Sequence, residues 1–311
     1  MTGDDKAKGA QKRAQGRTLG EFGALHPAEK KLLEACRIGE LARIGETRPE
    51  NKTAENSIRP AFLRFLALGG DVDAPVHDKG VQLQSGWIDD DIDLESCRVS
   101  VPLYLWNCTI TGALIVRSAD LRNLALDGSK VQGLDGDGLR CRGAFFLRNG
   151  FHTTGQVRLP GARIGGDFSC NGGRFEAGNR LALLCDGINA SGNTMLGNGF
   201  HATGGVNLHG AHIGGILSCR GGQFDGAGKS ALSCDGIEIE SAVFLDDGFH
   251  AIGAVRFVGA NIGNDLTCSG GVFECSSGDA LILDKAQIGG NVYLNAKRDE
   301  SRTFSATGTV R

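Results

Sequence analysis

Three histidines that could coordinate a metal recur at a spacing of 49 residues. They are His152, His201 and His250, and each follows a Gly-Phe pair. Histidine ligands lie about 2 Å from a zinc ion. If each 49-residue repeat folds into two stacked coils, successive histidines lie about 10 Å apart, so the three cannot share one ion. We expect each ring to bond a local backbone group, with contact to a ligand or partner as the alternative.

Ten cysteines are the second set of reactive side chains. They contain no Cys-x-x-Cys pair, and copies two coils apart exceed the roughly 7 Å between α-carbons that a disulfide allows. Eight of them fall where the apolar pattern points inward, so we interpret these as small buried thiols in a reducing compartment. The eight are Cys97, Cys108, Cys141, Cys170, Cys185, Cys219, Cys234 and Cys268.

The sequence lacks the motifs of common enzymes. It has no phosphate loop ending in Lys-Ser/Thr, no dinucleotide glycine pattern that opens a helix and no nucleophile elbow. The densest acidic run, Asp89–Asp91 with Asp93, is expected on a solvated corner. We therefore predict no catalytic, cofactor-binding or metal-binding residue.

Charge and hydropathy narrow the class of protein. With 33 Lys and Arg against 36 Asp and Glu, the net charge of −3 argues against nucleic-acid binding through a broad basic face. No apolar run approaches the roughly 18 residues of a membrane-spanning helix, and the polar start is unlike a signal peptide. A cytoplasmic protein is expected, with weak peripheral membrane contact through the basic N-terminal tail, residues 1–24, as an alternative.

An internal repeat must position these side chains. Residues 149–197, 198–246 and 247–295 align at a period of 49, as Phe151 and Phe200 illustrate. Within each repeat, pairs of alternating apolar residues come every five or six residues. This is the spacing of a very short strand followed by a corner, whereas a helix would need apolar partners three and four residues apart.

Short strands joined by corners of constant length coil into a parallel β-helix. The second apolar residue of each pair is predicted to point into the core and is called an inward centre. A repeat with eight inward centres fits two coils of four sides. The predicted fold is all-β, a right-handed four-sided parallel β-helix with a small α-helical N-terminal cap. One predicted inward ladder is Leu147, Cys170, Leu196, Cys219, Leu245, Cys268 and Leu294; another is Ile164, Ala190, Ile213, Ile239, Ile262 and Ile288.

Part of the chain resembles the pentapeptide-repeat proteins, whose units follow A-[D/N]-L-x-x. Residues Ala119–Asn123 match this pattern, and the looser unit Gly-Ala-x-Ile-Gly recurs at 161–165, 210–214 and 259–263. The looser units are similar to a bacterial group of pentapeptide-like proteins, some labelled membrane-associated oxidoreductase. The resemblance covers about residues 81–311. The resemblance implies a β-helical rod. It also implies two alternative activities, a membrane-associated oxidoreductase that uses the stacked loops and a topoisomerase-directed DNA mimic. A DNA mimic would be strongly acidic, so the net charge of −3 argues against the second alternative.

The chain divides into three predicted regions. Residues 1–24 form a disordered basic tail, residues 25–78 a helical cap and residues 79–311 the β-helix. The cap contains one helix with a stripe that extends to Leu41, and a second at Ile58–Leu68. We expect these helices to cover the open end of the first coil.

At the other end, a further repeat begins after residue 295 and is cut short. An uncovered last coil predicts a homodimer through about Leu281–Val310. The alternative is that Lys297–Arg302 folds back as a polar lid.

Outward side chains mark a candidate interaction surface. They lie beside inward centres, on the repeated corners, or on the insertion loops Glu176–Arg180, Asp225–Lys229 and Glu274–Gly278. The candidates are Trp87, Tyr104, Trp106, His152, His201, His250, Arg180 and Lys229. The three aromatic side chains are expected to form one outward cluster in the first two coils, with cover by the N-terminal helices as the alternative. A filled rod with regular outward faces favours a non-enzymatic scaffold or protein-interaction module, whose protein partner the sequence does not name.

Overall fold

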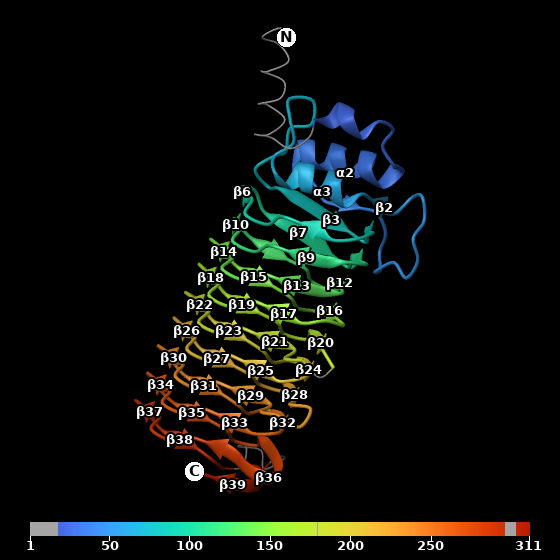
Figure 1. Ribbon diagram of the computed structural model, residues 1–311. Coiled ribbons are helices and arrows are strands. Elements are labelled where there is room, and N and C mark those ends of the chain that lie inside the picture. Colours follow the sequence, from blue (N-terminus) through green and yellow to red (C-terminus); the bar gives the residue numbers. More distant parts are fainter. Residues whose placement is uncertain (1–17, 179, 296–302) are drawn as a thin grey trace, which may run out of the picture.

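Strands of two to four residues, each ended by a corner, follow one another from Val81 to Thr267. The computed structural model describes residues 18–178, 180–295 and 303–311. It is a parallel β-solenoid with a helical region at its N-terminal end (Figure 1). The predicted all-β solenoid is therefore confirmed, while its handedness and the shape of its cross-section stay predictions.

From β3 to β32, each strand pairs in parallel with the strand four places further along the chain, which gives four ladders. The strands at the two ends of the rod join the same ladders at closer spacing in the chain. We name each ladder after its strand in the first coil. The β3 ladder consists of β1 (Ala42–Arg43), β3 (Val81–Gln84), β7 (Leu103–Trp106), β11 (Leu124–Ala125), β15 (Phe145–Phe146), β19 (Phe168–Ser169), β23 (Thr194–Met195), β27 (Leu217–Ser218), β31 (Val243–Phe244), β35 (Leu266–Thr267) and β38 (Val292–Tyr293).

The β4 ladder runs beside it along each coil. It consists of β2 (Ser57–Ile58), β4 (Trp87–Ile88), β8 (Thr109–Ile110), β12 (Lys130–Val131), β16 (His152–Thr153), β20 (Arg174–Glu176), β24 (His201–Thr203), β28 (Gln223–Asp225), β32 (His250–Ile252), β36 (Val272–Ile282) and β39 (Ser305–Val310).

The remaining two ladders complete each coil. The β5 ladder consists of β5 (Ile92–Asp93), β9 (Ala113–Ile115), β13 (Gly133–Asp135), β17 (Val157–Arg158), β21 (Leu183–Leu184), β25 (Val206–Asn207), β29 (Leu232–Ser233), β33 (Val255–Arg256) and the end of β36. The β6 ladder consists of β6 (Arg98–Val99), β10 (Asp120–Leu121), β14 (Arg140–Cys141), β18 (Arg163–Ile164), β22 (Asn189–Ala190), β26 (His212–Ile213), β30 (Glu238–Ile239), β34 (Asn261–Ile262) and β37 (Gln287–Ile288).

The core is the stack of inward side chains that the repeat predicts. Ile164, Ala190 and Ile213 are register partners on the β6 ladder, and the register continues to Ile288. The leucine–cysteine ladder is likewise buried from Leu147 to Cys268, but Leu294 is 41% exposed. Like side chains stack on like, so the rungs fill the interior without a change of register.

A column of seven phenylalanine rings runs inside the rod. Neighbouring centroids are 5.1 to 5.5 Å apart and the ring planes are tilted by 40–48°. Offset and tilted packing is the favourable arrangement for aromatic quadrupoles. The rings are those of Phe151, Phe175, Phe200, Phe224, Phe249, Phe273 and Phe304.

The cap contains η1 (Leu19–Phe22), α2 (Pro27–Ile38) and α3 (Pro60–Ala67). α2 ends before the predicted limit at Leu41, because Gly39 adopts the left-handed conformation that closes it. α3 is shorter than predicted at its start, because Ile58 belongs to β2 and pairs with β4. Both helices pack on the first coil, which places them at the rod's end (Figure 1).

The described parts of the predicted tail and of the predicted open last coil both contain further secondary structure. Residues 1–17 of the predicted tail lie outside the described residues, whereas Leu19–Phe22 form η1, whose Phe22 ring packs on Phe62 and Phe65. At the other end, β39 pairs along β36. The predicted lid lies largely at 296–302, outside the described residues, and the C-terminal dimer stays a prediction.

Candidate functional site

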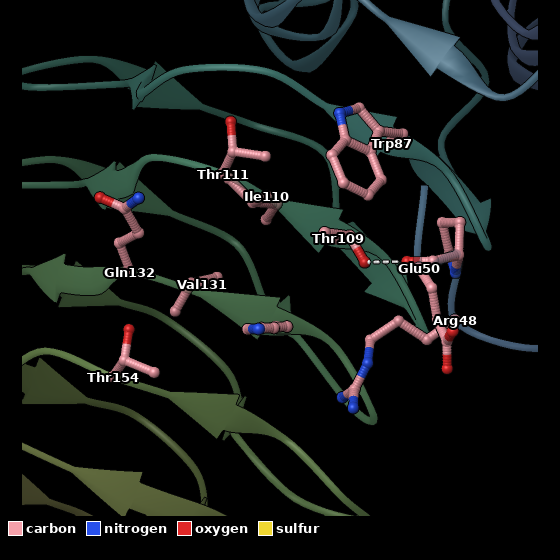
Figure 2. Close-up of a pocket in the computed structure, with 11 residues that line it drawn as sticks. Arg48, Glu50, Trp87, Thr109, Ile110, Thr111, Val131, Gln132 and Thr154 are labelled. Carbon is pink, nitrogen blue, oxygen red and sulfur yellow. Dashed lines mark hydrogen bonds between the residues drawn. The ribbon is translucent and has the colours of Figure 1, made fainter. Parts of the chain in front are cut away.

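A groove of about 510 Å³ lies between residues 48–50 and the outer face of the β4 ladder (Figure 2). Trp87 stands at one end of it. Thr111, Gln132 and Thr154 line it from successive coils (Figure 2). Hydroxyl and amide groups beside one aromatic ring are the chemistry of a binding surface for polar chain segments.

The wall of this groove is fixed by hydrogen bonds to the rod. Thr109 Oγ1 donates to the carbonyl of Pro49 at 2.6 Å. Arg48 Nη1 donates to the carbonyl of Gly128 at 2.8 Å, so the guanidinium reaches along the corner of the rod. The groove is therefore a preformed feature of the segment 44–56 on the β4 ladder.

The three predicted aromatic candidates do not form one cluster. Tyr104 and Trp106 stack on each other, with centroids 5.3 Å apart and planes 17° apart. Trp87 lies on a different ladder, and its indole N–H donates to Asp89 at 2.6 Å. All three side chains are half-buried.

Tyr104 begins a column of large side chains on the outer face of the β3 ladder. Its register partner on the next coil is Ala125, and the coil after that presents Phe146. Large and small residues then alternate without a break in register. Gln82 precedes Tyr104 in register, and from Tyr104 onward the outer column is Tyr104, Ala125, Phe146, Ser169, Met195, Ser218, Phe244, Thr267 and Tyr293.

Arginine guanidinium groups cover two rings of the outer column. The guanidinium carbon of Arg148 lies 3.8 Å from the centre of the Phe146 ring, and that of Arg220 lies 3.9 Å from the Phe244 ring. Arg220 also pairs with Asp246 at 2.9 Å. Burial raises the pKa of Asp246, and its interaction with Arg220 offsets part of that rise. Each guanidinium group covers one side of its ring by a cation–π contact. The two rings remain on the outer face of the ladder.

Sequence reasoning missed four members of this column, namely Phe146, Met195, Phe244 and Tyr293. The sequence contains a pattern that predicts them, because each directly precedes one of the predicted inward leucines and the four are spaced 49 residues apart. A residue beside an inward centre in a strand must point outward. Four large apolar side chains at such positions therefore predict an apolar outer stripe.

The three histidines lie on one outer column of the β4 ladder, with one strand between successive copies. Their expected backbone partners are wrong. His152 Nε2 lies 2.9 Å from Glu176, and His250 Nε2 lies 3.1 Å from Glu274. In both cases the carboxylate belongs to the strand paired with that of the histidine on the next coil, which brings it within reach of the ring.

Bonds to basic groups perturb the carboxylate that faces the first histidine. The hydrogen bond from His152, with that from Arg174 next, lowers the pKa of Glu176. His201 instead lies 3.3 Å from Thr203 Oγ1. Each of the three rings is thus tied to a neighbouring side chain, which suits a structural contact.

Two of the three predicted loops stand out from the surface. Arg180 and Lys229 are exposed on the segments that follow β20 and β28. The third segment is not a loop, because residues 274–278 continue strand β36. β39 pairs with β36 on both sides of this segment, at Glu274 and at Asp279, and the register shifts between these two pairs.

The cysteines hold neither a disulfide nor a metal cluster in the described ranges. Seven of the eight predicted inward thiols are buried, and Cys36 is buried as well. Cys97 departs from the prediction and is half-buried, with Arg64 Nη1 at 3.1 Å from its sulfur. The acidic run is likewise engaged locally, because Asp89 forms an ion pair with Lys52.

No family model, curated protein or solved structure matches this chain. The solenoid is compatible with a pentapeptide-repeat β-helix, and that resemblance rests on the repeat and on the stacked coils. None of the helices in the described residues is long and apolar enough to cross a membrane. The outer column and the groove are two surface features that the geometry offers for binding.

Proposed function

We propose that this protein is a non-enzymatic scaffold that binds a protein partner along the outer column of the β3 ladder. The column itself carries the proposal. Phe146, Met195 and Phe244 are half-buried and Tyr293 is 39% exposed, and all four lie outside the apolar interior of the rod. Large apolar groups in an ordered line on an outer face are typical of contact surfaces.

The spacing of the column suggests the form of the partner. Large side chains recur every two coils, or about 9.6 Å at a strand spacing of about 4.8 Å. Seven residues of an α-helix rise about 10.5 Å. We therefore propose an amphipathic helix that lies along the rod, with an apolar residue at every seventh position seated over Ser169, Ser218 or Thr267.

The test places a photo-crosslinking amino acid at Ser218, between Met195 and Phe244, and a second at Ser233, an outward serine on the β5 ladder, as a control. Both proteins are irradiated in cells of the source organism. We expect an adduct of discrete mass from Ser218 alone. Equal adducts from both positions, or none from Ser218, would contradict the proposal.

A pair of variants then tests the side chains. Phe146→Ser with Phe244→Ser should abolish the Ser218 adduct. The matched control is Leu184→Ser with Ile252→Ser, which removes outward apolar groups from other ladders. Thermal unfolding of both variants verifies that they fold, and loss of the adduct in the control as well would show that the column has no special role.

A further inference from the structure

The outer face of the β6 ladder is strongly basic over its first half. Its exposed side chains in this half include Arg98, Arg122, Arg140, Arg142 and Arg163. One acid lies among them, Asp120, which pairs with Arg142 at 2.7 Å. Four consecutive strands, β6, β10, β14 and β18, therefore carry an excess of positive charge.

The second half of the same face carries the opposite charge. Glu238 and Glu240 flank the inward Ile239 on β30, and their side chains are 68% and 64% exposed. The basic side chain beside them is His212, whose Nδ1 lies 3.4 Å from Glu238 and whose Nε2 lies 3.5 Å from Glu240. His212 offsets their negative charge only when it is protonated.

The two charged pairs lie at equal distances from the middle of the ladder. The strand order is β6, β10, β14, β18, β22, β26, β30, β34 and β37, so β22 is the centre. Arg140 and Arg142 flank the inward residue of β14, two strands before the centre. Glu238 and Glu240 flank that of β30, two strands after it. When the face is turned end for end about β22, the two arginines of β14 therefore lie opposite the two glutamates of β30.

We infer that a second copy of this chain docks on the β6 ladder, with the two rods antiparallel. A two-fold axis along β22 places Arg140 opposite Glu238 of the second copy and Arg142 opposite its Glu240. The same axis generates both pairs again, as a closed isologous contact requires. A parallel arrangement would place the arginines opposite one another, so the charges select the antiparallel one.

The side chains at the axis itself are short, while Arg163 of β18 lies opposite His212 of the second copy on the flanking strands. β22 presents Asn189, followed by Ser191, and the strands on either side are followed by Gly165 and Gly214. Short polar side chains at the axis can hydrogen-bond across it. The face is about 38 Å long at a strand spacing of about 4.8 Å, narrow for a protein interface, so the dimer is expected to be weak and dependent on salt.

This contact leaves the outer column of the β3 ladder on a different face. A dimer would therefore present two columns to partners, but the dimer does not depend on the function proposed for that column.

The test is analytical ultracentrifugation of the full chain over a concentration series at low and high salt. We expect the mass to rise from one chain, 32.6 kDa, toward two at low salt, and the association to weaken by about tenfold or more near 0.5 M NaCl. Arg140→Glu with Arg142→Glu, and Glu238→Arg with Glu240→Arg, should each be monomeric. An equimolar mixture of the two variants should restore a dimer, because unlike charges then face each other on both sides of the axis.

The outcomes separate this contact from others. A dimer that survives high salt and both reversals would lie elsewhere, at the C-terminal coil for example, and would overturn the inference. A monomer under every condition would do the same, and would leave the arginines as a surface for a different acidic partner. Circular dichroism of each variant verifies that the charge changes leave the rod folded.

Discussion

A Cβ atom on Gly222 would lie 2.7 Å from Cε2 of Phe224, so the glycine provides the space in which that ring lies. The same relationship joins Gly173 to Phe175, at 2.8 Å. In the coil between them, Ala202 is the register partner of both phenylalanines, and the ring comes instead from Phe200, two residues earlier. The aromatic column is thus supplied from two backbone positions in alternate coils.

Replacing Gly222 by Ala should destabilise the rod. The added methyl group would meet the Phe224 ring and also the Leu196 carbonyl oxygen at 2.6 Å, and backbone cannot move aside as a flexible side chain can. Overpacking of this kind costs about 1–3 kcal/mol. The free energy of unfolding, measured with a chemical denaturant, should fall by that amount. Gly20→Ala is the control, because a Cβ there meets nothing within 4 Å, and an equal loss in both variants would refute the packing argument.

The sequence predicted the interior of the rod well, for a physical reason. The apolar alternation reports directly on which side chains are inside, and stacking in a narrow core forces equivalent residues into register. Spacing alone predicts that Ile164 and Ala190 are neighbours, and they are register partners.

The outer surface was less predictable, because outward positions do not share that constraint. The partner of His152 depends on the length of the Glu176 side chain one coil away, which spacing alone does not reveal. Trp87 and Trp106 both flank inward centres, yet a corner separates their ladders, so the cluster expected from their proximity in sequence does not form. The groove depends on residues 48–50, whose path along the rod has no periodic signal.

Cys219→Ser should destabilise the rod through a buried hydroxyl. Cys219 is completely buried in the ladder between Leu196 and Leu245. A buried polar group without a partner costs about 1–3 kcal/mol, and the midpoint of denaturation should fall accordingly. Ser218→Ala changes the outward neighbour on the same coil and should be close to neutral. If the two substitutions had the same effect, the inward placement of Cys219 would not explain the loss.

Thiol labelling of the native protein should distinguish two fast cysteines from eight slow ones. Cys97 and Cys275 are half-buried, and the other eight are buried. Burial raises the pKa of the Cys108 and Cys268 thiols to about 12, so near pH 8 they carry almost no reactive thiolate. Mass spectrometry after brief exposure to a maleimide should show modification at Cys97 and Cys275 first. Early modification of the core thiols would contradict the packing described here.

The acid stability of the cap should depend on one buried carboxylate. Glu29 is completely buried in α2 and accepts hydrogen bonds from Arg59 Nε at 2.7 Å and Nη2 at 2.6 Å. The backbone N–H groups of Arg59 and His26 also donate to it. Burial raises the pKa of Glu29, but these bonds and the charge of Arg59 together lower it below the ordinary value of 4.5.

A carboxylate whose pKa is lowered by folding stabilises the folded state above its unfolded pKa, and this contribution is lost as the pH falls through the folded value. We therefore expect the cap to lose stability below about pH 4.5, and Glu29→Gln to remove that dependence. At pH 7 the same substitution should cost about 3 kcal/mol, because it leaves the Arg59 guanidinium without its charged partner. Hydrogen exchange of α2 and α3 between pH 3 and pH 7 measures both effects. Glu34→Gln, at an exposed position on the same helix, should preserve the wild-type pH profile, and an unchanged profile in Glu29→Gln would show that another group controls the acid response of the cap.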